Sequence, residues 1–236
     1  MNSILAFETS SPVLSVALGT RQGKIKEFRS RSPLKHSENL IPLVDRLLKQ
    51  EKISLKEIDA FAIDRGPGSF TGLRIGFSFL KGLLAARKKP CYGALSLDMI
   101  SENVRPREGT RLGVVVDARR ETIYSRIYLC RKGEWVSEGK LQLVSFTELK
   151  TRLREGMVFT GDALARYGSS LEEAFGKQIH FLSRNRWFPS AASLVKGFQA
   201  RNSRLSPLER ARDFLPLYFR ASEAEEKRRA LTNYVG

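Results

Sequence analysis

The pattern of apolar and polar residues predicts strands first, and then helices and strands in turn, over the first hundred residues. Three extended runs open the chain, at residues 4–8, 14–19 and 24–30. Apolar residues then recur at the spacing of a helix, namely Leu40, Ile41, Val44, Leu47 and Leu48. Further strands are predicted at residues 60–64 and 91–94, each followed by a helix. The resulting order of elements is βββαβαβα.

The second half of the chain repeats this order after a polar linker at residues 105–110. Its strands are predicted at residues 112–117, 121–130, 135–144, 157–160 and 179–183. One helix is predicted to begin at the capping box Ser145–Glu148. Two more helices are predicted at residues 163–175 and 190–202. We therefore expect an α/β chain of two duplicated domains, at residues 1–104 and 105–236. A C-terminal helical tail is predicted at residues 222–229, with packing against the first domain as one arrangement.

A glycine-rich turn at residues 66–76 joins the strand at residues 60–64 to the next helix. Backbone N–H groups at a helix N-terminus, together with the helix dipole, attract anions. Glycines also supply the backbone angles of plain turns that bind nothing, so the sequence leaves both interpretations open. The spacing of Gly66, Gly68 and Gly72 misses the dinucleotide-binding pattern, and no Gly-Lys-Ser/Thr follows. Two common phosphate loops are therefore excluded.

Composition and charge limit the classes of protein that fit. The 236 residues carry 41 basic and 25 acidic side chains, a net charge of +16 that favours a polyanionic partner, with a solvated basic surface as the alternative. No apolar run approaches the ~20 residues of a membrane helix, and the N-terminus lacks a signal-peptide pattern, so we expect a cytoplasmic protein without membrane contact. Two distant cysteines and only two histidines argue against a disulfide framework or a zinc site.

Several short motifs together resemble the TsaB, or YeaZ, family. They are residues 7–10, 36–38, 65–76, 81–83, 117–120 and 216–218, which span nearly the whole chain. The resemblance implies an actin/Hsp70-like (ribonuclease H-like) fold of two domains. It also implies a non-catalytic subunit that dimerises with the larger paralogue TsaD for threonylcarbamoyl transfer to adenosine 37 of tRNA. The implied partners are TsaD, the ATPase TsaE and tRNA through the complex, with a homodimer when the chain is alone.

Two departures from the catalytic paralogue bear on the expected chemistry. Ser96 and Ile100 stand where the resemblance places two metal-binding histidines of TsaD, so we expect no metal and no catalytic residue. Residues 117–120 replace a Ser-Gly-Gly turn of TsaD and lose the glycines that let a backbone approach phosphate. We expect no required cofactor, with ATP or ADP bound weakly or at the interface of the complex. The candidate nucleotide-binding residues are Glu8, Thr9, Ser10, Gly66, Gly68, Ser69, Asp117, Arg119 and Arg120.

The helix after the glycine turn and the helix at residues 37–50 form the predicted partner surface. Gly72 and Gly76 lie four residues apart on one helix face, where they make a flat strip for close packing of another backbone. That backbone belongs either to a second protein, which the family resemblance supports, or to a strand of the same domain. His36 has no nucleophile or carboxylate at a readable spacing, which favours a structural role. The predicted interface residues are His36, Leu40, Val44, Phe70, Thr71, Gly72, Arg74, Ile75, Gly76 and Phe77.

Two other functions stay open from the sequence alone. An ATP-binding or ATP-hydrolysing enzyme of the actin/Hsp70/kinase fold would need a carboxylate at the first hairpin, which Glu8 provides, and an intact second phosphate hairpin, which this chain lacks. A stand-alone basic module that binds tRNA rests on the net charge of +16.

Overall fold

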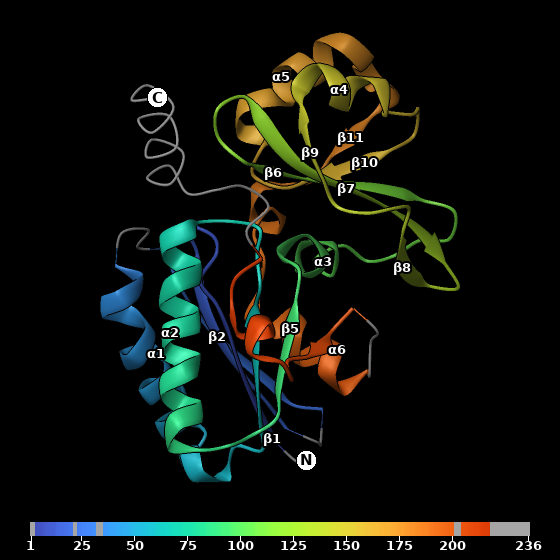
Figure 1. Cartoon of the computed structure of the whole chain (residues 1–236). Helices are drawn as coiled ribbons and strands as arrows, with labels where there is room; N and C mark the ends of the chain where they lie inside the picture. The colour runs from blue at the N-terminus through green and yellow to red at the C-terminus, as the bar shows by residue number, and fades with distance from the viewer. Residues whose placement is uncertain (1–2, 21–22, 32–34, 201–203, 218–236) are drawn as a thin grey trace, which may run out of the picture.

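Two mixed β-sheets, each covered by helices on both faces, make up the protein (Figure 1). The computed structural model describes residues 3–20, 23–31, 35–200 and 204–217. Within these ranges both halves follow the predicted order of strands and helices, except that one strand is divided in two and a short strand at Ser206–Pro207 is not among those predicted. The expected α/β class with two mixed sheets is therefore confirmed.

The first sheet is centred on β1 (Ser3–Glu8), which lies between an antiparallel and a parallel neighbour. The other strands are β2 (Leu14–Thr20), β3 (Ile25–Ser30), β4 (Ala60–Asp64), β5 (Cys91–Ala94) and β12 (Ser206–Pro207). Their order across the sheet is β12-β5-β4-β1-β2-β3. Because β1 and β4 run parallel, with Phe7 opposite Ile63, their carboxyl ends meet at one edge of the sheet.

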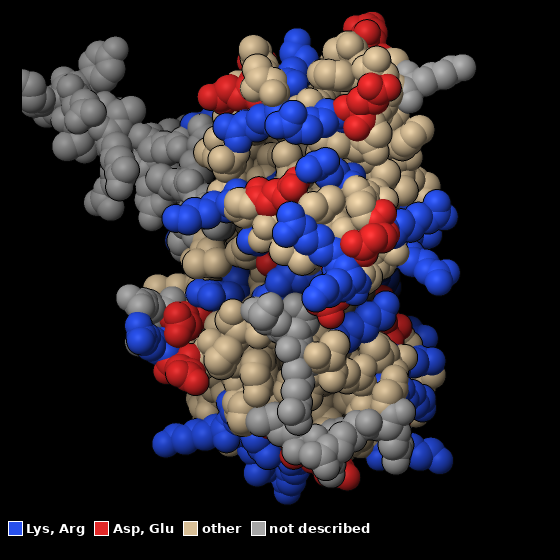
Figure 2. Space-filling view, turned by 90° about the vertical axis from the view of Figure 1, so that its right-hand side faces the viewer, with Lys and Arg blue, Asp and Glu red and all other residues tan. Residues whose placement is uncertain are grey.

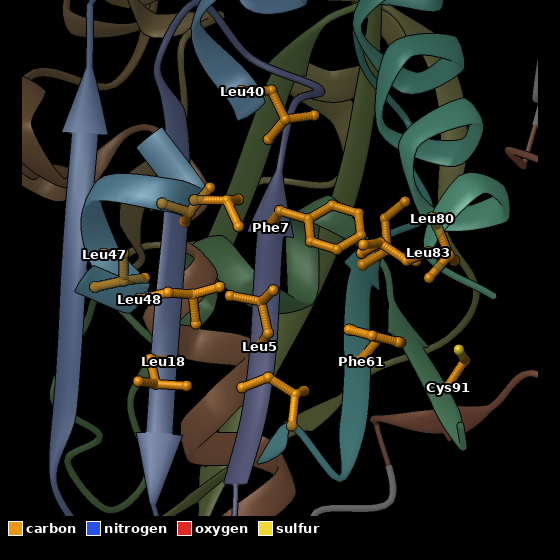
Figure 3. Close-up of a cluster of buried hydrophobic side chains, with 14 of the residues drawn as sticks. Leu5, Phe7, Leu18, Leu40, Leu47, Leu48, Phe61, Leu80, Leu83 and Cys91 are labelled. Carbon is orange, nitrogen blue, oxygen red and sulfur yellow. The ribbon is translucent and has the colours of Figure 1, made fainter. Parts of the chain in front are cut away.

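Helices α1 (His36–Gln50) and α2 (Phe70–Ala86) pack on one face of this sheet. Figure 3 shows the core between the sheet and the two helices. There Leu5 and Phe7 of β1 pack with Leu47 of α1 and Leu80 of α2. All four side chains are almost completely buried. The predicted helical spacing in α1 is thus confirmed, except that Ile41 points away from the core and is 62% exposed.

The second sheet has the order β11-β10-β6-β7-β8, with β9 also paired to β7. Its strands are β6 (Arg111–Asp117), β7 (Thr122–Arg131), β8 (Glu134–Ser137), β9 (Gln142–Ser145), β10 (Val158–Thr160) and β11 (His180–Phe181). Helices α4 (Phe146–Thr151) and α5 (Leu164–Phe175) cover one face. In the described part of the chain, short 3₁₀ helices lie at Leu55–Glu57, Gly176–Gln178, Arg184–Arg186 and Ala211–Phe214.

The single strand predicted at residues 135–144 is wrong. Two strands, β8 and β9, occupy this range, and both pair antiparallel with β7. The chain between them passes through Gly139 at a φ of +95°, a backbone angle that ends an extended strand. The helix predicted at residues 222–229 lies outside the described residues, as does the end of the helix predicted at 190–202.

Each half of the chain supplies a helix that packs against the sheet of the other half. Helix α6 (Ala191–Gln199), from the second half, covers the free face of the first sheet, where Leu194 and Val195 meet Ile4 of β1. Helix α3 (Ser96–Ser101), from the first half, places Leu97 and Ile100 against the second sheet. The packing of these helices crosses the proposed division between residues 104 and 105.

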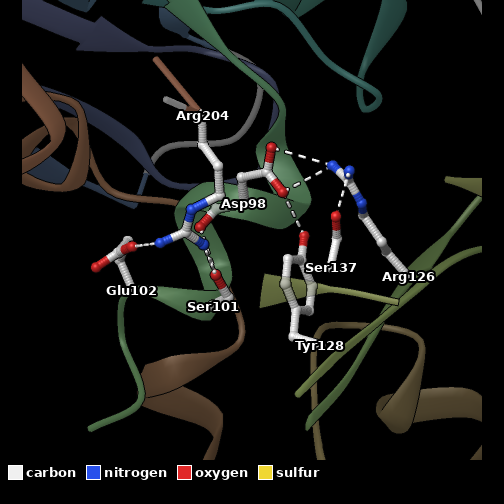
Figure 4. Close-up of polar contacts among 7 residues, drawn as sticks. All are labelled: Asp98, Ser101, Glu102, Arg126, Tyr128, Ser137 and Arg204. Carbon is white, nitrogen blue, oxygen red and sulfur yellow. Dashed lines mark hydrogen bonds and ion pairs between the residues drawn. The ribbon is translucent and has the colours of Figure 1, made fainter. Parts of the chain in front are cut away.

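A buried polar network fixes α3 to the second sheet (Figure 4). The carboxylate of Asp98 accepts hydrogen bonds from Arg126 Nη1 at 2.8 and 3.1 Å and from the Tyr128 hydroxyl at 2.6 Å. Burial raises the pKa of Tyr128 well above its usual value, so this hydroxyl keeps the proton that it donates. Arg204 continues the network with a 2.8 Å hydrogen bond to Ser101 and an ion pair with Glu102. Among the described helices, none is long and apolar enough to span a membrane.

Candidate functional site

Two carboxylates lie side by side where β1 and β4 end. Glu8 is the last residue of β1 and Asp64 the last residue of β4, and both are fully buried. The hydroxyl of Ser10 lies between them, 2.7 Å from Glu8 Oε1 and 2.7 Å from Asp64 Oδ2. The strand ends and the hairpin at residues 8–13 therefore form one polar cluster beneath the glycine turn.

Each carboxylate accepts further hydrogen bonds from its own surroundings. Glu8 accepts from the backbone N–H groups of Ser10 and Ser11, at 2.5 and 3.0 Å, and from the Ser11 hydroxyl. Asp64 Oδ1 accepts from the Gly66 N–H and from the Ser96 hydroxyl, both at 2.7 Å. These bonds fix the course of the hairpin and of the turn after β4.

Burial is the main cause of raised pKa values in this pair. It raises the pKa of Glu8 from 4.5 to about 8, with repulsion from Asp64 adding to the shift, and that of Asp64 from 3.8 to about 6. Because these values exceed those of the unfolded chain, the folded state binds the extra proton more tightly. The stability that this proton contributes is complete below about pH 4 and is lost as the pH rises through about 8.

The glycine turn is closed onto the hairpin. The Ser69 N–H donates to the Ser10 carbonyl at 2.6 Å, and a Cβ at Gly68 would lie 2.5 Å from the same oxygen. The hydroxyl of Ser69 caps α2 by accepting from the Gly72 N–H at 3.2 Å. The N–H groups of Gly66, Ser69 and Gly72, which could otherwise face an anion, are thus bonded within the chain, and two buried acids lie beneath them. These residues fit a strand-to-helix turn better than an anion cradle.

The second half also carries two acids at neighbouring strand ends, but they are joined through a backbone N–H and not through a shared hydroxyl. Asp117 ends β6, Asp162 follows β10, and the Asp117 N–H donates to Asp162 Oδ1 at 2.9 Å. Burial raises the pKa of Asp162 to about 6. Arg119 pairs at 3.3 Å with Asp117 of its own turn, and residues 119–121 all have positive φ angles. A pair of acids at this position opposes phosphate binding by electrostatic repulsion.

The residues at the paralogue's histidine positions do not fit a metal. Ser96 donates its hydroxyl proton to Asp64, and Ile100 is 1% exposed in the core beneath the second sheet. An isoleucine has no donor atom, and a serine hydroxyl is a weak ligand. In the described ranges, no three His, Cys, Asp or Glu side chains cluster in a way that could hold a metal ion.

An apolar groove of about 500 Å³ runs between α1 and α2 on the surface of the first domain. Figure 1 shows the two helices side by side, away from the second sheet. Ile41 is the most exposed of the large apolar side chains in the described chain. The Arg74 guanidinium stacks on the Phe70 ring, with Cζ 3.9 Å from the ring centre. The groove is lined by Ser37, Leu40, Ile41, Phe70, Thr71, Arg74, Ile75, Ser78 and Phe79.

The structure divides the predicted interface residues into two groups. Phe70, Thr71, Arg74 and Ile75 line the groove with partly or fully exposed side chains, and Leu40, which is 1% exposed, lies at its floor. The remaining five residues are buried within the chain and offer a partner almost no side-chain surface. They are His36, Val44, Gly72, Gly76 and Phe77.

The glycine strip of α2 packs against the chain's own hairpin, which accounts for both glycines without a partner. A Cβ at Gly72 would overlap the Thr9 carbonyl oxygen, and a Cβ at Gly76 would lie 2.5 Å from Thr9 Oγ1. The alternative is packing against a strand of the same domain. The observed contact is close to this alternative, because Thr9 directly follows β1. His36 is structural, because its Nε2 hydrogen-bonds the Ser11 carbonyl at 2.8 Å.

Sequence and structure comparisons agree on one family. A family model described as "TsaD: tRNA N6-adenosine threonylcarbamoyltransferase" matches residues 31–228, which is most of the chain. The chain belongs to the TsaD family. Within this family it is similar to "tRNA threonylcarbamoyladenosine biosynthesis protein TsaB" of Bacillus subtilis, with 25% identity over 95% of this chain and 97% of that one.

Two further relatives of this TsaD-family chain carry TsaB or YeaZ names. The TsaB protein of Escherichia coli is 34% identical over 51% of this chain and 52% of its own length. The solved structure "YeaZ from Pseudomonas aeruginosa" superposes with a TM-score of 0.75 and 26% identity, and covers 93% of this chain and 100% of that chain. The resemblance to the TsaB, or YeaZ, family is confirmed.

Proposed function

We propose that this chain is a non-catalytic subunit that docks onto a TsaD protein and so supports threonylcarbamoyl transfer to adenosine 37 of tRNA. The observation that carries the proposal is the apolar groove between α1 and α2, with Ile41 62% exposed beside it. Its relatives are named as biosynthesis proteins of tRNA threonylcarbamoyladenosine. A groove walled by two helices suits an apolar helix face of a partner.

The absence of catalysis is proposed from the residues that occupy the chemical positions. Ser96 and Ile100 are engaged in a hydrogen bond and in the core, respectively. Two acids lie close together near each hairpin, Glu8 with Asp64 and Asp117 with Asp162, where a nucleotide would place its phosphates. The chain then needs no cofactor of its own, and ATP or ADP would be bound weakly or only at the interface of the complex.

The remaining partners follow from the same docking surface. TsaE and tRNA would join through the complex with TsaD, and a second copy of this chain would cover the groove when TsaD is absent, all in the cytoplasm. Figure 2 shows Lys and Arg side chains spread over both domains on one face, with acidic side chains among them. This spread favours general attraction to RNA over a dedicated RNA-binding site on this chain.

Ile41→Glu is expected to weaken binding to TsaD at least about 30-fold, because a charge replaces an apolar anchor in a desolvated groove. Isothermal titration calorimetry of the purified chain with TsaD measures this. The matched control is Val136→Glu on β8, a side chain that is 45% exposed in the other domain. Equal affinity for the two variants would contradict docking through the groove.

The biochemical role is tested by reconstitution of the modification from tRNA, ATP, threonine and bicarbonate with the carbamoyl-AMP synthase, TsaD and TsaE. We expect product only when this chain is present, and much less with Ile41→Glu than with Val136→Glu. Equal product without the chain would sink the proposal. Turnover of ATP by the chain alone, lost in Glu8→Ala, would instead support an ATP-hydrolysing enzyme.

A further inference from the structure

We propose that Asp64 is a positioning residue of the docking groove, because one proton shared between Asp64 and Glu8 holds the hairpin at residues 8–13 closed against both groove helices. Only the effect of Asp64 on partner binding rests on the proposed function. The structural part of the inference stands on the hydrogen bonds around Ser10 and can be tested on the isolated chain.

The hydroxyl of Ser10 has too few protons for both of its short contacts. Its oxygen lies 2.7 Å from Glu8 Oε1 and 2.7 Å from Asp64 Oδ2. A hydroxyl has one proton to donate, and an ionised carboxylate has none. With both acids ionised, one of these short contacts would join two oxygen atoms without a hydrogen between them. One carboxyl group must therefore be protonated and donate to Ser10.

The extra proton lies on Asp64 and not on Glu8. Glu8 Oε1 already accepts the N–H groups of Ser10 and Ser11 in addition to the Ser10 hydroxyl. Asp64 accepts the Gly66 N–H and the Ser96 hydroxyl on its other oxygen, Oδ1, whereas Oδ2 contacts Ser10. The geometry thus favours a chain in which Asp64 Oδ2 donates to Ser10 Oγ and Ser10 Oγ donates to Glu8 Oε1.

The hairpin connects this chain of bonds to the groove. The carbonyl of Ser10 accepts the Ser69 N–H at the start of α2, and Thr9 packs under the glycines of that helix. The carbonyl of Ser11 hydrogen-bonds His36 at the start of α1. One short hairpin therefore sets the position of both helices that wall the groove, and the shared proton sets the position of the hairpin.

Few other charges surround the pair in the described chain. His36 from α1 contacts the hairpin backbone, and Asp98 from α3 repels Asp64 while it is paired with Arg126 of β7. Arg65 follows Asp64 and lies 4.0 Å from Asp213, and Arg74 of α2 lies at the surface. Burial without a nearby paired cation keeps the proton bound into the neutral range.

The pH dependence follows from the pair titrating together. Because Glu8 and Asp64 share one proton, the higher of their two pKa values, about 8, belongs to the pair and not to Glu8 alone. A single proton lost with this pKa changes a linked equilibrium about tenfold between pH 7 and pH 9. The closed hairpin, and with it the affinity of the groove, is favoured at the lower pH.

Asp64→Asn tests the proposal, because an amide nitrogen at the Oδ2 position donates permanently to Ser10 while the amide oxygen still accepts from Gly66 and Ser96. The readout is hydrogen exchange of the Ser69 amide in the isolated chain, corrected for intrinsic exchange. We expect its protection to fall about tenfold between pH 7 and pH 9 in the native chain, and less than about twofold in Asp64→Asn. Asp64→Ala should lose protection at both values.

Binding to purified TsaD provides the second readout. The affinity of the native chain should fall about tenfold between pH 7 and pH 9, and the affinity of Asp64→Asn should not change with pH. The matched control is Asp45→Asn, which removes an exposed acid of α1 that pairs with Lys49 and should keep the native pH dependence. An Asn variant that is unfolded, or as pH-dependent as the native chain, would overturn the inference. Absence of TsaD binding at every pH would sink the proposed function, whereas hydrogen exchange at Ser69 decides the structural part independently of any partner.

Discussion

Gly72→Ala is expected to destabilise the protein by about 3 kcal/mol or more, which corresponds to a fall in melting temperature of ~6 to 12 °C. The added methyl group would overlap the carbonyl oxygen of Thr9, a backbone atom held by the hairpin. Neither α2 nor the hairpin can move aside without breaking the Ser69–Ser10 hydrogen bond. Thermal unfolding followed by circular dichroism measures the loss.

Gly82→Ala in the same helix is the matched control. A Cβ at Gly82 would meet nothing within 4 Å, so the change should gain the ~0.8 to 1 kcal/mol of alanine over glycine in a helix. Opposite signs for two identical substitutions would locate the effect in the contact with Thr9. A Gly72→Ala melting temperature equal to that of the native chain would show that the hairpin does not lie against α2.

Asp98→Ala is expected to cost ~3 to 5 kcal/mol, because it leaves the partly buried guanidinium of Arg126 and the buried hydroxyl of Tyr128 without their shared acceptor. Asp98 is 5% exposed, so water does not readily replace the lost bonds. Chemical denaturation measures the loss in the free energy of unfolding.

The control for Asp98 is Glu138→Ala, which removes an ion pair with Arg111 at the surface of the second sheet. The two side chains are 34% and 41% exposed, and such pairs contribute at most ~1 kcal/mol. If Asp98→Ala costs no more than Glu138→Ala, the network in Figure 4 is not a principal attachment of α3 to the second sheet.

Local patterns predict most of the elements, because the spacing of apolar residues reports which face of a helix or strand is covered. They do not report what covers it. Leu194 and Val195 mark an apolar face of α6, and only the structure shows that β1 and β2 of the other half meet that face. The division of residues 135–144 into two strands is also hard to predict. Gly139 is the signal for the break, but a single glycine in a polar run does not by itself show that a strand ends there.

The candidate site is only partly predictable. The first hairpin points to Glu8, Thr9 and Ser10, whereas nothing near them points to Asp64, because it lies 54 residues from Ser10 and ends an otherwise apolar strand. A signal is nevertheless present in the sequence: an acid stands at or just after the ends of β1, β4, β6 and β10. In a duplicated parallel arrangement, these acids must meet in pairs.

The crossing of α3 and α6 has a consequence for dissection of the protein. A fragment that ends at residue 104 would leave the face of β1 and β2 opposite α1 and α2 open to water, and the complementary fragment would lose Leu97 and Ile100 from beneath its sheet. Each fragment would then lack the helix that covers one face of its sheet, α6 in the first case and α3 in the second. The two halves therefore suit a split-protein reporter, in which separately expressed fragments regain solubility and structure only when they meet.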